Sequence, residues 1–156
     1  MARSPGLIQA TAIAALISGT VYGLAAVISF VASGGTSPMR IFWYIASALL
    51  GSDAASHGGM LTAELGVVLH YLVSVIWTVI FFMLYPRLRM LGKYPLSAAV
   101  GYGFLVWAVM NFAVVPLSKA PKILFNPTTS GVTVAILIVC FGLPLSLLAR
   151  RHFTKV

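Results

Sequence analysis

The chain has 156 residues, of which 60% are hydrophobic and 8% are charged, and its mean hydropathy is +1.03. Soluble domains carry about 25% charged residues, so this composition excludes a soluble enzyme, a soluble nucleic-acid-binding module and a disordered chain. The net charge of +8 comes from ten Lys and Arg residues against two acidic residues. In a membrane protein such an excess sets orientation and contacts anionic headgroups, so we expect membrane lipids, and not nucleic acid, as partners.

Four mostly apolar runs are long enough to cross a bilayer, since a spanning helix needs about 20 such residues. They cover residues 7–31, 60–85, 96–117 and 132–149. Strict alternation of polar and apolar residues is absent, which favours helices over membrane strands. The first run is longer than the apolar core of a signal peptide, so we expect it to be retained. The sequence predicts an all-α polytopic membrane protein, with residues 1–156 forming one four-helix transmembrane domain.

The distribution of Lys and Arg predicts the orientation of the spans. Seven basic residues lie on the side of the two termini, and three lie on the opposite side. The seven are Arg3, Arg87, Arg89, Lys93, Arg150, Arg151 and Lys155, and the three are Arg40, Lys119 and Lys122. Because positive residues favour the cytoplasmic side, we expect both termini in the cytoplasm.

The first outer loop, residues 32–59, contains a helical pattern of its own. Residues 38–50 alternate polar and apolar side chains with a helical period but are too few to span a bilayer. We therefore expect a short interfacial or re-entrant helix there. A second turn is expected at Ser52 and Asp53, and the glycines after His57 form a flexible corner before the second span.

Both acidic residues and two of the three histidines lie between Asp53 and His70. Ionisable groups within a membrane are costly and face partners or a wet cavity, so we predict a polar ligand-binding pocket on the outer side. The candidate residues are Arg40, Asp53, His57, Glu64, His70 and Asn111. In the alternative interpretation, Arg40 pairs with Glu64 or Asp53 only to dock the short helix. In that case His70 and Asn111 only form hydrogen bonds between helices.

A metal centre or a catalytic site has little support in these patterns. Glu64 and His70 are six positions apart, which separates them by about 120° around a helix. No HExxH pattern occurs. Serines near His57 in sequence do not define a catalytic triad, because a triad is defined by geometry. We therefore expect no metal, no cofactor and no catalytic residue.

Small residues recur every four positions on two of the predicted spans. They are Ala15, Gly19 and Gly23 on the first span, and Ser97 and Gly101 on the third. This spacing lets helix backbones approach closely in lipid. We expect these residues to pack within the bundle and not to form a dimer face.

Aromatic residues near the predicted span ends are typical of anchors at the membrane interface. They are Trp43, Tyr44, Tyr85, Tyr94 and Trp107. We expect them to lie in aromatic belts and not around a ligand.

Short motifs from residue 38 onward carry a resemblance to a known family. The earlier motifs are Arg40–Gly51, His57-Gly58-Gly59, Leu65-Gly66 and Leu69-His70. The later motifs are Val106-Trp107, Met110-Asn111, Val114–Ser118 and Gly142-Leu143-Pro144. On these motifs the chain resembles an uncharacterised family of small four-helix bacterial inner-membrane proteins. The resemblance implies that architecture and the bacterial inner membrane, and it implies no activity.

One position departs from the family's pattern. The resemblance implies a further histidine on the last helix, where this chain has Val134–Cys140 without one. A mechanism that needs a pair of histidines across the bundle is therefore not expected.

Three classes of function remain for an integral inner-membrane protein without a soluble domain. The favoured class is an accessory subunit or a protein that binds lipid or a small ligand. The alternative is a small transporter or channel subunit, which would act as an oligomer because four helices leave little room for an aqueous path. A small membrane-embedded enzyme is the third class. A protein partner or a second copy of the chain fits the first two classes.

Overall fold

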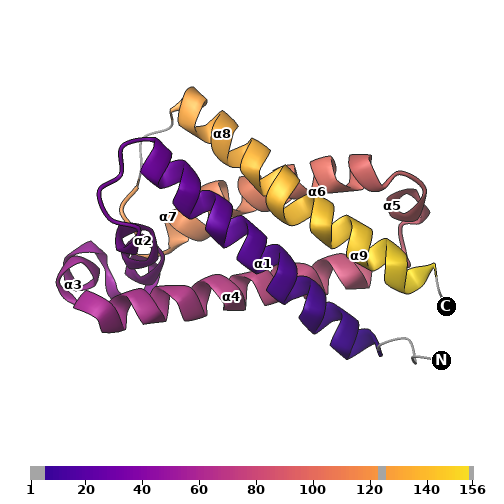
Figure 1. The fold of residues 1–156 in the computed structure, drawn as a ribbon, viewed down its shortest axis with the longest axis horizontal. Coiled ribbons are helices and arrows are strands. Elements are labelled where there is room, and N and C mark those ends of the chain that lie inside the picture. The colour runs from indigo at the N-terminus through magenta and orange to yellow at the C-terminus, as the bar shows by residue number, and fades with distance from the viewer. Residues whose placement is uncertain (1–5, 123–125, 155–156) are drawn as a thin grey trace.

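A computed structural model describes residues 6–122 and 126–154 as a bundle of four long helices (Figure 1). In this part of the chain all regular structure is helical. The elements are α1 (Leu7–Ala32), α2 (Met39–Leu50), α3 (Ser52–His57), α4 (Gly59–Leu84), α5 (Arg89–Lys93), α6 (Pro95–Val109), η1 (Met110–Val114), α7 (Val115–Leu117), α8 (Pro127–Leu137), η2 (Ile138–Gly142) and α9 (Leu143–Phe153).

Four continuous helical stretches are long and apolar enough to cross a membrane. They are Leu7–Ala32, Gly59–Leu84, Pro95–Leu117 and Pro127–Phe153. The all-α, polytopic membrane architecture predicted from the sequence is confirmed, and so is the short helix between the first two spans.

The fourth span begins at Pro127, several residues before the predicted start at residue 132. Asn126 explains the difference, because its side-chain oxygen accepts hydrogen bonds from the backbone N–H groups of Thr128 and Thr129 at 3.0 and 3.4 Å. This is an N-cap, and proline suits the first helical position that follows it. The capped first turn is polar, so an apolar run could not reveal it.

Helix α2 lies across one end of the bundle. Figure 1 shows it almost end on, whereas the long helices run across the page. The choice between an interfacial and a re-entrant helix stays a prediction. Trp43 Nε1 donates a hydrogen bond to the Gly59 carbonyl at 2.9 Å, and the Lys119 backbone N–H donates to the Ala48 carbonyl at 3.1 Å. Helix α2 is thus attached to the second span and to the end of the third.

A glycine allows α2 to rest on α4 at backbone distance. A Cβ atom at Gly66 would lie 2.1 Å from the carbonyl oxygen of Phe42, which is backbone and cannot rotate away. Only a residue without a side chain fits such an approach. The docking of α2 therefore depends on this position.

Two prolines in the last two spans are accommodated by a local widening of the helix. Segment η1 directly precedes the turn that contains Pro116, and η2 precedes Pro144. A proline lacks an N–H and clashes with the carbonyl four residues earlier, and a π turn shifts the hydrogen bonds to five residues back. The Val115 and Leu143 N–H groups bond in this way, to the carbonyls five positions before them. Both spans therefore continue through their prolines.

The small residues of the first span pack within the bundle, as predicted. A Cβ at Gly19 would lie 2.9 Å from Ser74 Oγ, and one at Gly23 would lie 3.1 Å from His70 Nε2, so α1 and α4 are in close contact. The prediction is wrong for Ser97 and Gly101, which are exposed. A Cβ at position 101 would meet nothing within 4 Å.

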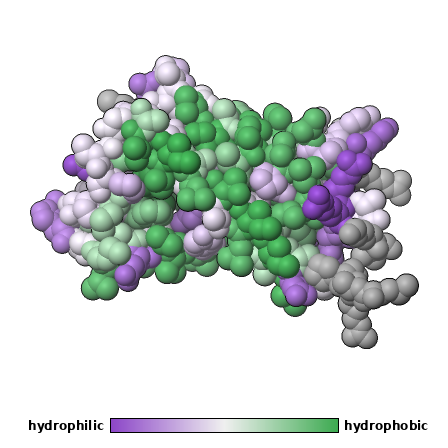
Figure 2. Space-filling model, in the orientation of Figure 1, coloured by the Kyte–Doolittle hydropathy of each residue, from purple (hydrophilic) through white to green (hydrophobic). Residues whose placement is uncertain are grey.

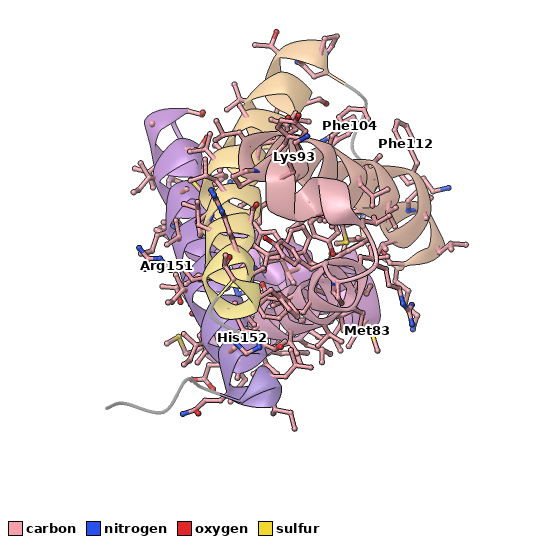
Figure 3. The ribbon with its side chains drawn as sticks, turned by 90° about the vertical axis from the view of Figure 1, so that its right-hand side faces the viewer. Met83, Lys93, Phe104, Phe112, Arg151 and His152 are labelled. Atoms are coloured by element: carbon pink, nitrogen blue, oxygen red, sulfur yellow. The ribbon has the colours of Figure 1, made fainter. Side chains whose placement is uncertain are left out.

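The start of α1 and the end of α9 lie at the same end of the bundle as α5, opposite α2 (Figure 1). This end is called the terminal end. Hydrophilic residues gather at both ends, and a hydrophobic surface covers the region between them (Figure 2). Figure 3 views the molecule from the terminal end, where Lys93, Arg151 and His152 are labelled. Arg3 and Lys155, which the sequence assigned to this side, lie outside the described residues.

Candidate functional site

A partly open cavity of about 260 Å³ lies where all four spans meet α2. Its wall is mostly apolar and is contributed by α1, α2, α4, α6, η1, α8 and η2. Six aromatic side chains line it: Tyr22, Phe42, Tyr44, Trp77, Trp107 and Phe141. Four polar side chains also reach the wall: His70, Ser74, Asn111 and Thr133. The sequence predicted a polar pocket, and the structure shows a mostly apolar cavity with a few polar groups.

His70 is held against α1 by a hydrogen bond that fixes its ring. Its Nε2 lies 2.9 Å from the carbonyl oxygen of Gly19. A carbonyl oxygen only accepts, so Nε2 carries the hydrogen. Tyr22 stacks on the ring at a centroid distance of 6.0 Å and an interplanar angle of 21°. Gly23 leaves the space that the ring occupies. In the neutral ring Nδ1 is therefore a hydrogen-bond acceptor.

Asn111 belongs to the π-helical segment η1 and lies on the exposed side of the cavity wall. Its Nδ2 donates to the carbonyl oxygen of Trp107 at 2.9 Å. This bond uses one of the two amide hydrogens and leaves the Oδ1 atom as an acceptor. The π turn shifts the residues of this stretch relative to a regular helix, which is common near functional sites.

Tyr44 brings a hydrogen-bond donor to the cavity from α2. Burial raises the pKa of its hydroxyl, because desolvation disfavours the charged form. The hydroxyl therefore stays protonated across the physiological range and retains its hydrogen.

Ser74 lines the same wall next to His70, but the pair is not an activated nucleophile. The Ser74 hydroxyl donates to the backbone carbonyl of His70 at 2.9 Å and not to its ring. A nucleophilic serine needs a base within hydrogen-bond distance of its hydroxyl. The described geometry at this pair is that of a helix-internal hydrogen bond.

The other four candidate residues lie away from the cavity. Arg40, Asp53, His57 and Glu64 are exposed, and none lines the wall. His57 Nδ1 bonds locally, with the Asp53 carbonyl at 2.9 Å and the Ser56 hydroxyl at 3.2 Å. The structure thus brings two of the six candidates, His70 and Asn111, to one cavity. A ligand-binding role for the six residues stays a prediction.

The described residues meet the alternative interpretation only in part, because the hydrogen bond of His70 to Gly19 joins two helices, whereas Asn111 bonds within its own helical stretch. No ion pair joins Arg40 to Asp53 or Glu64 in this part of the chain. Helix α2 is instead held by the Trp43 and Ala48 hydrogen bonds and by the close approach at Gly66. In the described ranges, no three His, Cys, Asp or Glu side chains are placed to hold a metal ion.

The sequence missed most of the residues that form the wall. Trp107 was expected in an aromatic belt, but only 8% of it is exposed and it lines the cavity. Tyr85 was expected in a belt too and is 6% exposed, whereas Tyr94 is 50% exposed, as an interfacial anchor would be. A usable signal existed at Tyr22, because a tyrosine hydroxyl inside a long apolar run needs a polar partner or a cavity.

No family model, no curated protein and no solved structure matches the chain. The resemblance to a family of bacterial inner-membrane proteins therefore stays a prediction.

Proposed function

We propose that this membrane protein binds a small lipophilic molecule in the cavity beneath α2. The observation that carries the proposal is the cavity of about 260 Å³ where α2 meets all four spans. Packed protein interiors contain few voids larger than a water molecule. An apolar cavity of about 150 Å³ takes up benzene, so this one has room for a fused pair of aromatic rings.

The construction of the wall supports a binding site over a packing defect. Helix α2 is fastened by hydrogen bonds at Trp43 and Ala48, and Gly66 is needed for its approach to α4. Ligand pockets are typically apolar and aromatic, with a few fixed polar groups that set orientation. His70, held by Gly19 and stacked on Tyr22, fits that description.

The composition of the cavity wall also favours ligand binding over the alternative functions. An aqueous path for ions or solutes needs a polar lining, and the cavity wall is mostly apolar, so we favour ligand binding over a transporter or channel subunit. An accessory subunit that presents the ligand to a protein partner or a second copy of the chain is compatible with the proposal. An enzyme would need an activated group, and Ser74 is not one.

We also propose a location and an orientation. The protein would lie in the cytoplasmic (inner) membrane of a bacterium, as the family that it resembles does, among lipids that cover its exposed apolar side chains. Both termini would face the cytoplasm, which the predominance of Lys and Arg on their side supports. The cavity would then open in the outer half of the membrane, close to α2.

Thiol labelling tests the orientation. In a Cys140→Ala background, Ser33→Cys and Thr128→Cys should react with an impermeant thiol reagent added outside intact cells, whereas Leu91→Cys should not. Ser33 directly follows α1 and Thr128 lies in the first turn of α8, both at the α2 end, whereas Leu91 lies in α5 at the opposite end. Labelling of Leu91→Cys alone would reverse the proposed orientation.

Mass spectrometry of natively purified protein tests the ligand-binding function. Wild type should carry a lipophilic compound enriched over the bulk lipid, and Ala26→Phe should lose it, because Ala26 lines the cavity. Ala12→Phe is the matched control, since Ala12 is on an exposed part of the same helix. Equal retention by Ala26→Phe and Ala12→Phe, or no enriched compound in wild type, would refute the proposal.

A further inference from the structure

The polar groups of the cavity select among lipophilic molecules. Because the Gly19 carbonyl receives the hydrogen on Nε2 of His70 at 2.9 Å, the neutral ring offers a lone pair on Nδ1. Among the described residues, no protein donor bonds to this atom. His70 lines the cavity, so this lone pair can accept a hydrogen bond from a ligand that carries a donor.

The uncharged lining of the cavity also limits the charge that the ligand can carry. No Asp, Glu, Lys or Arg is among the side chains that line the cavity in the described part of the chain. Burying an ionised group without a counter-charge is strongly unfavourable. The cavity therefore disfavours carboxylates and amines and favours a neutral molecule.

The size and the aromatic lining of the cavity indicate the ring system of the ligand. Aromatic side chains from α1, α2, α4, α6 and η2 surround the space, and aromatic faces pack well against flat rings. At about 260 Å³ the cavity holds a fused ring pair of roughly ten carbon atoms. A longer apolar tail would leave through the open side.

We infer that the ligand is a neutral, lipophilic aromatic alcohol whose hydroxyl donates to Nδ1 of His70, with its ring system between Tyr22 and the tryptophans of α4 and α6. This inference rests on the proposed ligand-binding function and assigns the class of ligand. The Oδ1 atom of Asn111 is a second acceptor on the same wall.

Three related probes test the inference: 2-naphthol, 2-methoxynaphthalene and 2-naphthoate. The first two share the ring system and differ in the donor hydrogen, and the third adds a charge. Calorimetric titration of the full chain in nanodiscs should give about tenfold tighter binding of 2-naphthol than of 2-methoxynaphthalene, and no measurable binding of 2-naphthoate. Ala26→Phe reports the uptake of each probe by the lipid alone.

Substitution of His70 assigns the preference to its ring. His70→Phe should bind 2-naphthol about tenfold more weakly than wild type and should leave 2-methoxynaphthalene within twofold. Retained binding of the methoxy probe shows that the variant is folded. Tyr71→Phe is the neighbouring control, because Tyr71 bonds to Thr20 and does not line the cavity.

A spectroscopic measurement on wild type applies even where His70→Phe fails to fold. The ¹⁵N resonance of Nδ1 of His70 should shift with 2-naphthol and not with 2-methoxynaphthalene. His57→Gln and His152→Gln, which alter the other two histidines of the chain, assign the signal. An unshifted resonance overturns the role of His70.

The outcomes separate the two proposals. If wild type binds none of the three probes, the proposed function fails and the ligand class falls with it. If wild type binds 2-naphthol and 2-methoxynaphthalene equally, or binds 2-naphthoate best, the ligand class is wrong and the binding function stands.

Discussion

The two ends of the bundle are built differently although the same four spans form both. At the terminal end the helices meet in a packed aromatic and aliphatic core, in which Phe81 and Leu145 are 0% exposed and Tyr85 stacks on Phe153 at 5.0 Å. At the α2 end the spans border the partly open cavity of about 260 Å³. The terminal end is therefore closely packed, whereas the α2 end leaves room for a ligand.

Small and large residues at the helix contacts account for the difference. A Cβ at Gly142 would lie 2.6 Å from the Ala99 carbonyl, so the last two spans touch at backbone distance there. Small residues permit such contacts in lipid. Towards α2, the large side chains of Trp107 and Phe141 line the cavity.

The largest effect is expected from the same substitution made on the two sides of η2 in the last span. Leu145→Ala should lower the free energy of unfolding by about 3 kcal/mol, since it leaves a void in a fully packed core. Leu137→Ala should lower it by about half as much, because Leu137 already borders the cavity. Reversible unfolding in detergent measures both, and equal losses would contradict the contrast between the two ends.

The next effect concerns the attachment of α2. Gly66→Ala should lower the free energy of unfolding by about 2 kcal/mol, because its Cβ would overlap the Phe42 backbone and displace α2. The matched control Gly101→Ala meets open space and should be neutral or stabilising by up to about 1 kcal/mol, as expected for Gly→Ala in a helix. Hydrogen exchange of the backbone amides in α2 measures this displacement. Unchanged protection in Gly66→Ala would show that α2 and α4 are not in tight contact at this position.

The smallest effect is expected from a hydrogen bond between the two regions. Tyr102→Phe should lower the free energy of unfolding by about 1 kcal/mol, because it removes the bond from the Tyr102 hydroxyl to the Trp77 carbonyl at 2.5 Å. Tyr71→Phe removes an exposed bond to Thr20 and should have less effect. Thermal unfolding of both variants measures the two effects, and a larger loss of stability in Tyr71→Phe would reverse the expected order.

Elements with a local signal could be predicted from the sequence. The spans follow from uninterrupted apolar runs, and α2 follows from a helical period in a segment too short to cross. His70 and Asn111 were predicted to line one pocket, because ionisable and polar groups inside apolar helices tend to face a cavity or a partner, and both line the cavity.

The remaining wall of the cavity could not be predicted, because it depends on contacts between distant parts of the chain. Trp77 and Phe141 lie in apolar runs, where an aromatic residue fits a lipid-facing surface as well as an interior. Arg40 and Glu64 were predicted to belong to the pocket because charges are rare in this chain, but both are exposed and lie away from the cavity. The contact of Gly66 with Phe42 depends on how α2 crosses α4, which periodicity does not encode.

The most direct test of a ligand site at the α2 end is the thermal stability of the protein with and without 2-naphthol. A ligand that binds only the folded state stabilises it by about 2.7 kcal/mol at a hundredfold excess over its Kd. We predict a clear rise in Tm for wild type and Ala12→Phe, and none for Ala26→Phe, in which the added ring fills the cavity. An equal rise in Ala26→Phe would show that the probe acts elsewhere and would contradict the account.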